Sequence, residues 1–232
     1  MQLRQLIQGL THLFYPHLCE GCNKPLIANE WILCISCEAQ LPETGNCTIP
    51  ENETGLRFAG RIPYIYAASF AYFTDEGLLQ HLIHGLKYKN KQDIGRYLGR
   101  IFGQQLNSSG WIKEVDMIVP VPLHPAKLAA RGFNQSELIA AGISVATGIP
   151  VYNNILLRTR NTESQTKKSR SERVDNMKNA FRISENSNIN GKHILICDDI
   201  LTTGATIEAC ALTLSTEKSI KISIATIGIA VS

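Results

Sequence analysis

The sequence predicts an α/β fold in which helices flank a parallel sheet, with a small cysteine-containing module at the N-terminal end. Short apolar runs alternate with segments of helical periodicity from about residue 62 onward, and this alternation is typical of parallel α/β sheets. Two pairs of cysteines precede all of these segments. A chain of 232 residues is long enough for one substantial core and a small appended module.

The composition is that of an ordinary globular protein. Hydrophobic residues make up 44% of the chain and charged residues 19%, and the net charge of +3 is too small to indicate nucleic-acid binding by itself. No apolar stretch reaches the roughly 18 residues that a membrane span needs. Seven cysteines, an odd number, without an export signal predict a cytoplasmic protein and disfavour a disulfide framework.

The first residues favour an amphipathic helix over a secretory signal, because polar residues interrupt any apolar core of a signal. We expect the helix to pack on its own protein. Binding to a membrane surface is the alternative, which its few basic residues disfavour. The apolar positions at helical spacing are Leu3, Leu6, Ile7, Leu10 and Leu13.

Two Cys-x2-Cys pairs predict a structural zinc site within an N-terminal module at 1–48. Each pair lets two thiolates bind one metal from a tight turn, and two pairs complete a tetrahedral site that soft thiolates favour for Zn²⁺. A redox Cys-x2-Cys is the alternative, but it needs a thioredoxin-like context. The four ligands are Cys19, Cys22, Cys34 and Cys37.

Residues 42–55 are polar and rich in turn-forming types, which predicts a linker. Cys47, just outside the pairs, is interpreted as a spare thiol. The second predicted domain then covers residues 56–232.

Each element of this domain follows from its local pattern. The aromatic and β-branched alternation of 62–73 predicts two strands or one bent strand, and the acidic start and apolar spacing of 75–88 predict a helix. A second helix is expected at 91–106. Further strands are expected at 116–123, 193–197 and 221–231, and further helices at 136–148, ended by Gly148, and at 205–216.

The segment 194-ILICDDILTTGAT-206 combines two adjacent carboxylates with a loop suited to an anion. Backbone amides just before a helix have no intrahelical partner, and the helix dipole favours negative charge there. Gly204 permits a positive φ or a close approach of the backbone. The predicted monophosphate cradle consists of Thr202, Thr203, Gly204, Ala205 and Thr206.

Several interpretations of Asp198 and Asp199 compete. A Walker-B strand needs a G-x-x-x-x-G-K-[ST] partner that the chain lacks. A receiver domain carries its aspartates on the first strand, and simple helix capping explains one acid only. A sugar phosphate explains both halves of the segment, because carboxylates accept hydrogen bonds from a vicinal diol while the loop holds the phosphate.

The segment DDILTTGAT resembles the 5-phosphoribosyl-1-pyrophosphate (PRPP) signature of type I phosphoribosyltransferases. The resemblance implies that Asp198 and Asp199 bind the ribose hydroxyls and that residues 202–206 bind the 5-phosphate. Nearly the whole chain resembles the ComF family of competence-associated proteins. The further stretches that carry this resemblance are LIHGLKYKN (82–90), VPVPLHPAKLAARGFNQSELIA (119–140) and the T-x-x-Q…R-x-x-N…A-F pattern of 162–181.

The pyrophosphate of PRPP needs Mg²⁺ and basic or amide donors. By the resemblance, the loop after the strand at 116–123 is the pyrophosphate loop, and Arg131 joins the two aspartates as a catalytic residue. A rigid proline-rich turn with solvated cations is the alternative. Lys87 is expected to contact phosphate or a base, or simply to end a helix. The residues carried over are Arg131, Gly132, Asn134 and Gln135, and Lys127 is a further basic candidate in the same loop.

The segment 159–178 is predicted to be a flexible basic loop. In the enzymes that the chain resembles, such a loop closes over PRPP and excludes water; it equally suits a nucleic-acid backbone. The family tends to have Gly-Leu where this chain has Lys167-Lys168, which turns the loop toward anionic ligands. The residues concerned are Gln165, Lys167, Lys168, Arg170 and Arg173.

Two functions from different classes follow. The first is a phosphoribosyltransferase with an unknown nitrogenous acceptor, for which His124 and Glu137 are unsupported candidates for a general base, while His84 is interpreted as structural. The second is a non-catalytic PRPP- or nucleotide-binding adaptor. The ComF resemblance implies a link to DNA uptake, single-stranded DNA, and competence-helicase or recombination-mediator partners.

Overall fold

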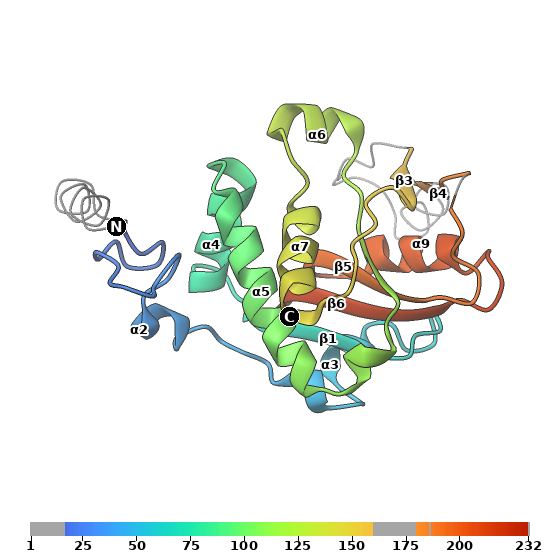
Figure 1. Cartoon of the computed structure of the whole chain (residues 1–232), viewed down its shortest axis with the longest axis horizontal. Coiled ribbons are helices and arrows are strands. Elements are labelled where there is room, and N and C mark those ends of the chain that lie inside the picture. Colours follow the sequence, from blue (N-terminus) through green and yellow to red (C-terminus); the bar gives the residue numbers. More distant parts are fainter. Residues whose placement is uncertain (1–16, 160–179, 186, 232) are drawn as a thin grey trace, which may run out of the picture.

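The computed structural model of the chain describes residues 17–159, 180–185 and 187–231 (Figure 1). The N-terminal helix and most of the basic loop, including all five of its named residues, lie outside this range. No helix within the described range is long and apolar enough to cross a membrane. The strands are β1 (Ala67–Phe73), β2 (Met117–Pro120), β3 (Leu156–Arg158), β4 (Phe181–Ile183), β5 (His193–Leu201) and β6 (Lys221–Ala230). The α-helices are α2 (Ile35–Glu38), α3 (Glu53–Leu56), α4 (Leu78–Tyr88), α5 (Gln92–Ser108), α6 (Pro125–Arg131), α7 (Gln135–Thr147) and α9 (Ala205–Leu214), and the 3-10 helices are η1 (Asn46–Thr48) and η2 (Trp111–Glu114).

The expected parallel sheet is confirmed. Its strands lie in the order β1-β6-β5-β2, and every neighbouring pair is parallel. The carboxyl ends of all four strands therefore meet at one edge, where Asp198 pairs in register with Thr226 of β6. The short strands β3 and β4 form a separate antiparallel pair.

The sheet is buried on both faces, so its strands read as continuous apolar runs. Along β5, Leu195 packs into a core with helices α4, α5 and α7, whereas Ile194 and Ile196 pack into a second core with α9. In Figure 1, α4, α5 and α7 stand side by side and α9 lies apart from them. This three-layer arrangement leaves the strand ends as the place where polar side chains can gather.

Helices α5 and α7 cross so closely that side chains are excluded at their contact. A Cβ atom at Gly99 would lie 2.1 Å from the Ile139 carbonyl oxygen, and one at Gly142 would lie 2.2 Å from the Arg96 carbonyl oxygen. The contact fixes α7, whose first turn reaches the end of β5.

The cysteine-containing module packs against α4 and α5. Its buried residues, including Leu26 and Leu33, belong to the same core as those helices. Trp31 meets Tyr97 of α5 edge to face, with ring centroids 6.3 Å apart, and Lys91 Nζ lies 2.5 Å from a Glu20 carboxylate oxygen. The division of the chain into domains 1–48 and 56–232 stays a prediction.

Residues 42–55, expected as a linker, instead fold onto β1. The Asn52 side-chain amide donates to the Ala67 carbonyl at 2.8 Å, and the Thr54 hydroxyl donates to Ser69 Oγ at 2.8 Å. Turn-forming residues here satisfy backbone groups of the sheet rather than solvent. The strand expected over 62–73 is one strand that begins only at Ala67.

Candidate functional site

Three elements bring polar side chains together at the carboxyl end of β5. Ser136 Oγ, in the first turn of α7, donates to Asp198 Oδ1 at 2.8 Å. The amide of Asp199 donates to the same oxygen at 2.9 Å. Lys87 Nζ, at the end of α4, lies 2.6 Å from Asp199 Oδ2, and Asp199 Oδ1 accepts from the amide of Ile200 at 2.6 Å. The acidic pair is thus held by hydrogen bonds at Asp198 and by an ion pair at Asp199.

The environment of Asp198 favours its neutral form. Burial raises the pKa of Asp198 and the charge of Asp199 raises it further, while the Ser136 hydroxyl, the Asp199 amide and Lys87 lower it; the net result is a pKa of about 7. A carboxyl group with such a pKa accepts or releases a proton near neutral pH.

The loop after β5 has the geometry of an anion site. Gly204 takes the left-handed conformation with φ 78° and is the N-cap of α9, which confirms the expected positive φ. Thr202 and Thr203 are exposed. The amide of Ala205 donates to Thr203 Oγ1 in a long hydrogen bond of 3.4 Å. Thr206 follows in the first turn of α9.

The predicted pyrophosphate residues divide between site and scaffold. Asn134 is buried and caps α7: its Oδ1 accepts from the Ser136 amide at 3.1 Å, and its Nδ2 donates to the Val121 carbonyl at 3.0 Å. Gly132, with φ 84°, ends α6. Lys127 is exposed on α6. These contacts give Asn134 and Gly132 a structural explanation, and their part in binding stays a prediction.

Arg131, the last residue of α6, reaches toward Tyr88 at the end of α4. Its guanidinium donates to the Gln135 side-chain carbonyl and lies 5.8 Å from the centroid of the Tyr88 ring. Tyr88 is also next to His84, with ring centroids 4.9 Å apart. His84 is exposed, so its interpretation as a structural residue of an apolar stripe is wrong.

A cavity of about 510 Å³ lies along the face of α4 that carries His84 and Tyr88. His84, Lys87 and Tyr88 line it together with Gln80, His81 and Phe73. Because Lys87 also reaches Asp199, the cavity borders the acidic pair.

The two unsupported candidates for a general base have local structural roles. His124 Nδ1 accepts from the Ala126 amide at 3.2 Å and caps α6. A Glu137 carboxylate oxygen accepts from the Asn134 side-chain amide at 3.3 Å.

Three residues near the site were missed by the sequence analysis. Ser136 contacts Asp198. Arg61 Nη1 donates to the Thr203 carbonyl at 2.8 Å. Arg158 of β3 lies over the Phe181 ring at 5.4 Å. Burial lowers the pKa of its guanidinium, while the nearby charge of Asp198 raises it. Only the motif next to Ser136 carried any signal in the sequence.

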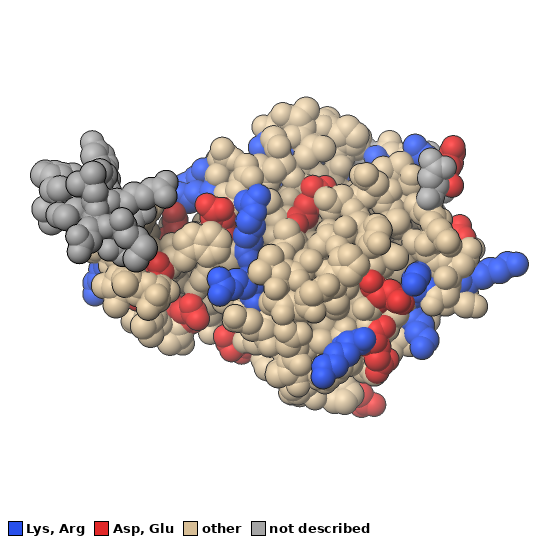
Figure 2. Space-filling model, in the orientation of Figure 1, with Lys and Arg blue, Asp and Glu red and all other residues tan. Residues whose placement is uncertain are grey.

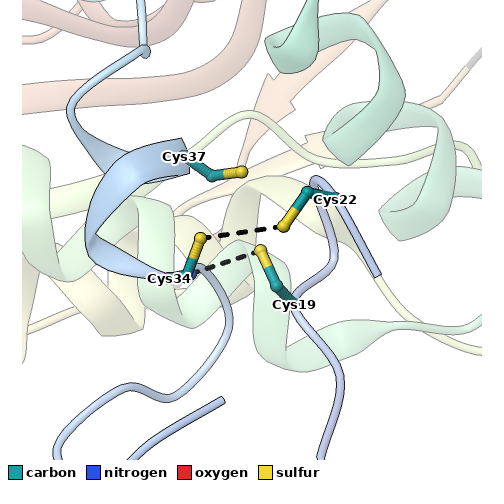
Figure 3. Close-up of side chains that lie close together, drawn as sticks. All are labelled: Cys19, Cys22, Cys34 and Cys37. Carbon is teal, nitrogen blue, oxygen red and sulfur yellow. Dashed lines mark hydrogen bonds between the residues drawn. The ribbon is translucent and has the colours of Figure 1, made fainter. Parts of the chain in front are cut away.

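The four predicted zinc ligands form one cluster (Figure 3). Their sulfur atoms all lie within 4.8 Å of one another, and Cys22 Sγ is 3.7 Å from Cys34 Sγ. A tetrahedral site with Zn–S bonds of about 2.3 Å places sulfurs about 3.8 Å apart, so the cluster fits structural zinc. The Cys19 sulfur accepts from the Cys34 amide at 3.2 Å. Burial raises the pKa of the Cys19 thiol, but hydrogen bonds from backbone amides outweigh burial and lower this pKa to about 7.

Charged side chains of both signs are interspersed over the face shown in Figure 2. The described residues on this face form no continuous basic surface. The basic segment that was expected to suit a nucleic-acid backbone lies largely outside the described residues.

A family model for the phosphoribosyl transferase domain matches residues 88–228. DNA utilization protein YhgH of Salmonella typhi is 30% identical over 211 residues, which are 86% of this chain and 91% of that protein. Competence protein F of Haemophilus influenzae is 29% identical over 209 residues, 86% of this chain and 85% of that protein. Competence protein ComFC of Bacillus subtilis is 34% identical over 95 residues, 41% of this chain and 36% of that protein.

The parallel sheet, the acidic end of β5 and this family match define a phosphoribosyltransferase-type domain. The chain belongs to the ComF family, as its relatives and its four-cysteine cluster agree.

Proposed function

We propose that this protein binds PRPP and transfers its phosphoribosyl group to a nitrogenous acceptor with release of pyrophosphate. The observation that carries the proposal is the convergence of Lys87 and Ser136 on an acidic pair directly before the 202–206 loop. Lys87 offsets one of two adjacent negative charges, so a phosphate can approach the loop with less repulsion. The carboxylate oxygens then accept hydrogen bonds from the ribose diol.

In the reaction, the bond from C1 of the ribose to pyrophosphate breaks and a bond from C1 to the acceptor nitrogen forms. Arg131 and Lys87 supply positive charge near the departing pyrophosphate, and the acidic pair balances the positive charge that develops on the ring. Mg²⁺ suits the oxygen donors of substrate and carboxylates and would neutralise pyrophosphate when bound. We assign Lys127, Gly132, Asn134 and Gln135 to the rim and scaffold of the pyrophosphate side.

The cavity beside α4 is our candidate for the acceptor. Its volume of about 510 Å³ is within the range of small-molecule sites. The exposed rings of His84 and Tyr88 offer stacking surfaces, and Gln80 and His81 offer hydrogen-bonding groups. His81→Ala, which changes an exposed residue of the cavity lining, should then weaken use of the acceptor while leaving PRPP binding within about twofold.

The names of the relatives, DNA utilization protein and competence proteins, support a role linked to DNA uptake or use. A non-catalytic adaptor that binds PRPP is the second candidate, favoured by Lys167-Lys168 in place of the usual Gly-Leu. Single-stranded DNA and helicase or recombination-mediator proteins are the partners we propose for either function. The structural zinc module would serve folding rather than chemistry.

Calorimetric titration of PRPP with Mg²⁺ is the first test. The wild type should bind, the variant with Asp198→Asn and Asp199→Asn should lose at least about a hundredfold in affinity, and Asp93→Asn, an exposed acid on α5, should bind as the wild type does. Pyrophosphate release upon addition of nitrogenous acceptors then separates an enzyme from an adaptor. Absence of aspartate-dependent binding would refute both.

A further inference from the structure

Arg61 lies against the 202–206 loop although it is distant from it in the sequence. Its Nη1 donates to two backbone carbonyls at 2.8 Å, that of Arg57 and that of Thr203. Its Nη2 forms an ion pair with Glu208, an acid in the first turn of α9. The guanidinium therefore links the turn after α3 to both the loop and the helix that follows it.

The contact with Thr203 fixes the direction of the next amide. A trans peptide is planar, so its C=O and N–H point in opposite directions. Because the Thr203 carbonyl points at Arg61, the N–H of Gly204 points away from Arg61. A left-handed residue beside successive amides that have no intrahelical partner is the geometry of a backbone anion nest.

Phe58 packs against Gly204 on the same side as Arg61. A Cβ at Gly204 would lie 2.8 Å from Phe58 Cε1 and 3.5 Å from Arg61 Nη1. Phe58 is fully buried. The turn that carries Phe58 and Arg61 thus backs the loop closely enough to hold Gly204 in its left-handed conformation.

Arg61 also neutralises the charge of Glu208. An acid in the first turn of a helix interacts favourably with the helix dipole but repels an anion bound at the same end. The ion pair with Arg61 offsets that charge.

We propose that Arg61 is a positioning residue for the 5-phosphate of a sugar phosphate, acting by orienting the Thr203–Gly204 peptide. The inference rests on the proposed function. Arg61 itself is not a phosphate ligand in this assignment, because its donors are directed at the Arg57 and Thr203 carbonyls and at Glu208.

The test is calorimetric titration of ribose 5-phosphate and PRPP into full-length Arg61→Ala, Arg61→Lys and Arg61→Ala with Glu208→Gln. Arg61→Ala should weaken both ligands about tenfold, the effect of one lost charge-assisted hydrogen bond. Lysine keeps the charge and one carbonyl contact, so Arg61→Lys should recover part of the loss. Arg57→Ala is the matched control: it removes a cation from the same turn, one that contacts the Ala230 carbonyl rather than the loop.

The double variant separates orientation from charge. If Arg61 acts through the peptide, the loss persists when Glu208 is also neutral; full recovery in the double variant would overturn the inference. Equal affinities of wild type and Arg61→Ala would overturn it too and leave the proposed function intact. A wild type that binds neither ligand would refute the proposed function, and the inference with it. Thermal unfolding within about 3 °C of wild type shows that each variant folds.

Discussion

Lys87 Nζ and Asp199 Oδ2 lie 2.6 Å apart, joining the end of α4 to the end of β5. The Asp199 side chain is 8% exposed and the Lys87 side chain 23%. A carboxylate this buried is costly without a partner. The ion pair therefore holds together the two elements that border the candidate site and its neighbouring cavity.

Lys87→Met should destabilise the fold and weaken PRPP binding. Breaking a fully buried ion pair costs about 3–5 kcal/mol, and because Lys87 is partly exposed we expect about 2 kcal/mol. Urea unfolding measures the change in the free energy of unfolding, and calorimetry measures the affinity.

The same prediction has a specific control and a specific rescue. Lys89→Met removes an exposed cation one position beyond α4 and should change stability by less than about 0.5 kcal/mol. Adding Asp199→Asn to Lys87→Met should recover most of the lost stability, because no buried charge is then left unpaired. A double variant as unstable as Lys87→Met would show that the lysine contributes by packing alone.

Asp198 makes the stability of the protein depend on pH. Its pKa is about 7 in the folded protein against an ordinary value of 3.8. Between these values the folded state holds a proton that the unfolded chain has released, so stability falls as pH rises from about 4 to about 7. Asp198→Asn removes this dependence. The full pKa difference corresponds to about 4 kcal/mol, but Asp198 is only partly buried, so solvent screening reduces the effect. We expect the variant to be more stable than wild type by about 2 kcal/mol at pH 8 and by little at pH 4. Urea unfolding of both proteins across this range would contradict the prediction if the difference stayed constant.

The sequence predicted those parts of the fold that depend on local chemistry. Gly148 ends α7 with φ 76°, as expected, and the anion loop has its glycine at the helix N-cap. The expected strand at 193–197 extends to Leu201, because aspartates with hydrogen-bond donors can remain within a parallel strand that their types do not favour. Strands β3 and β4, three residues each, are too short to leave a periodic pattern.

The site was predictable only where its residues lie within one motif. Asp198 and Asp199 are recognisable in the sequence because they are adjacent and follow an apolar run. Ser136 and Arg61, by contrast, reach the site through tertiary contacts that no local pattern encodes. Asn134 shows the opposite difficulty. A helix cap and a ligand-binding amide have the same residue type, and only the contacts of its side chain reveal the cap.

The close crossing of α5 and α7 predicts an unusually costly glycine substitution. Gly99→Ala would place a Cβ 2.1 Å from a backbone carbonyl, which cannot move without shifting α7. We expect a loss of about 3 kcal/mol or more. Gly85→Ala is the control: its Cβ would meet the flexible end of Ile94 at 3.2 Å and should cost less than about 1 kcal/mol. Thermal unfolding of both variants checks the order.

Zinc removal should release the N-terminal module from α5. A chelator removes the zinc ion and Cys22→Ser removes one of its ligands. Because zinc binding supplies folding energy, Trp31 should then separate from Tyr97 and its fluorescence should shift to longer wavelength. Cys47→Ser is the control, since Cys47 is buried apart from the cluster, with its sulfur 4.0 Å from Gln105 Oε1. Absence of zinc from the purified wild type, measured by atomic absorption, would contradict the four-cysteine site.

Ser136 should set the pH at which the diol is bound. Its hydroxyl donates to Asp198 at 2.8 Å and lowers the pKa of that carboxyl group, so Ser136→Ala should raise the pKa above its present value of about 7. Because the diol is bound by the charged carboxylate, the midpoint of PRPP affinity against pH should move upward in the variant, while affinity well above both midpoints changes by less than about threefold. Ser144→Ala, on the same helix but remote from β5, should leave the midpoint in place. A uniform loss of affinity at every pH, with an unmoved midpoint, would mean that Ser136 shapes the site without tuning Asp198.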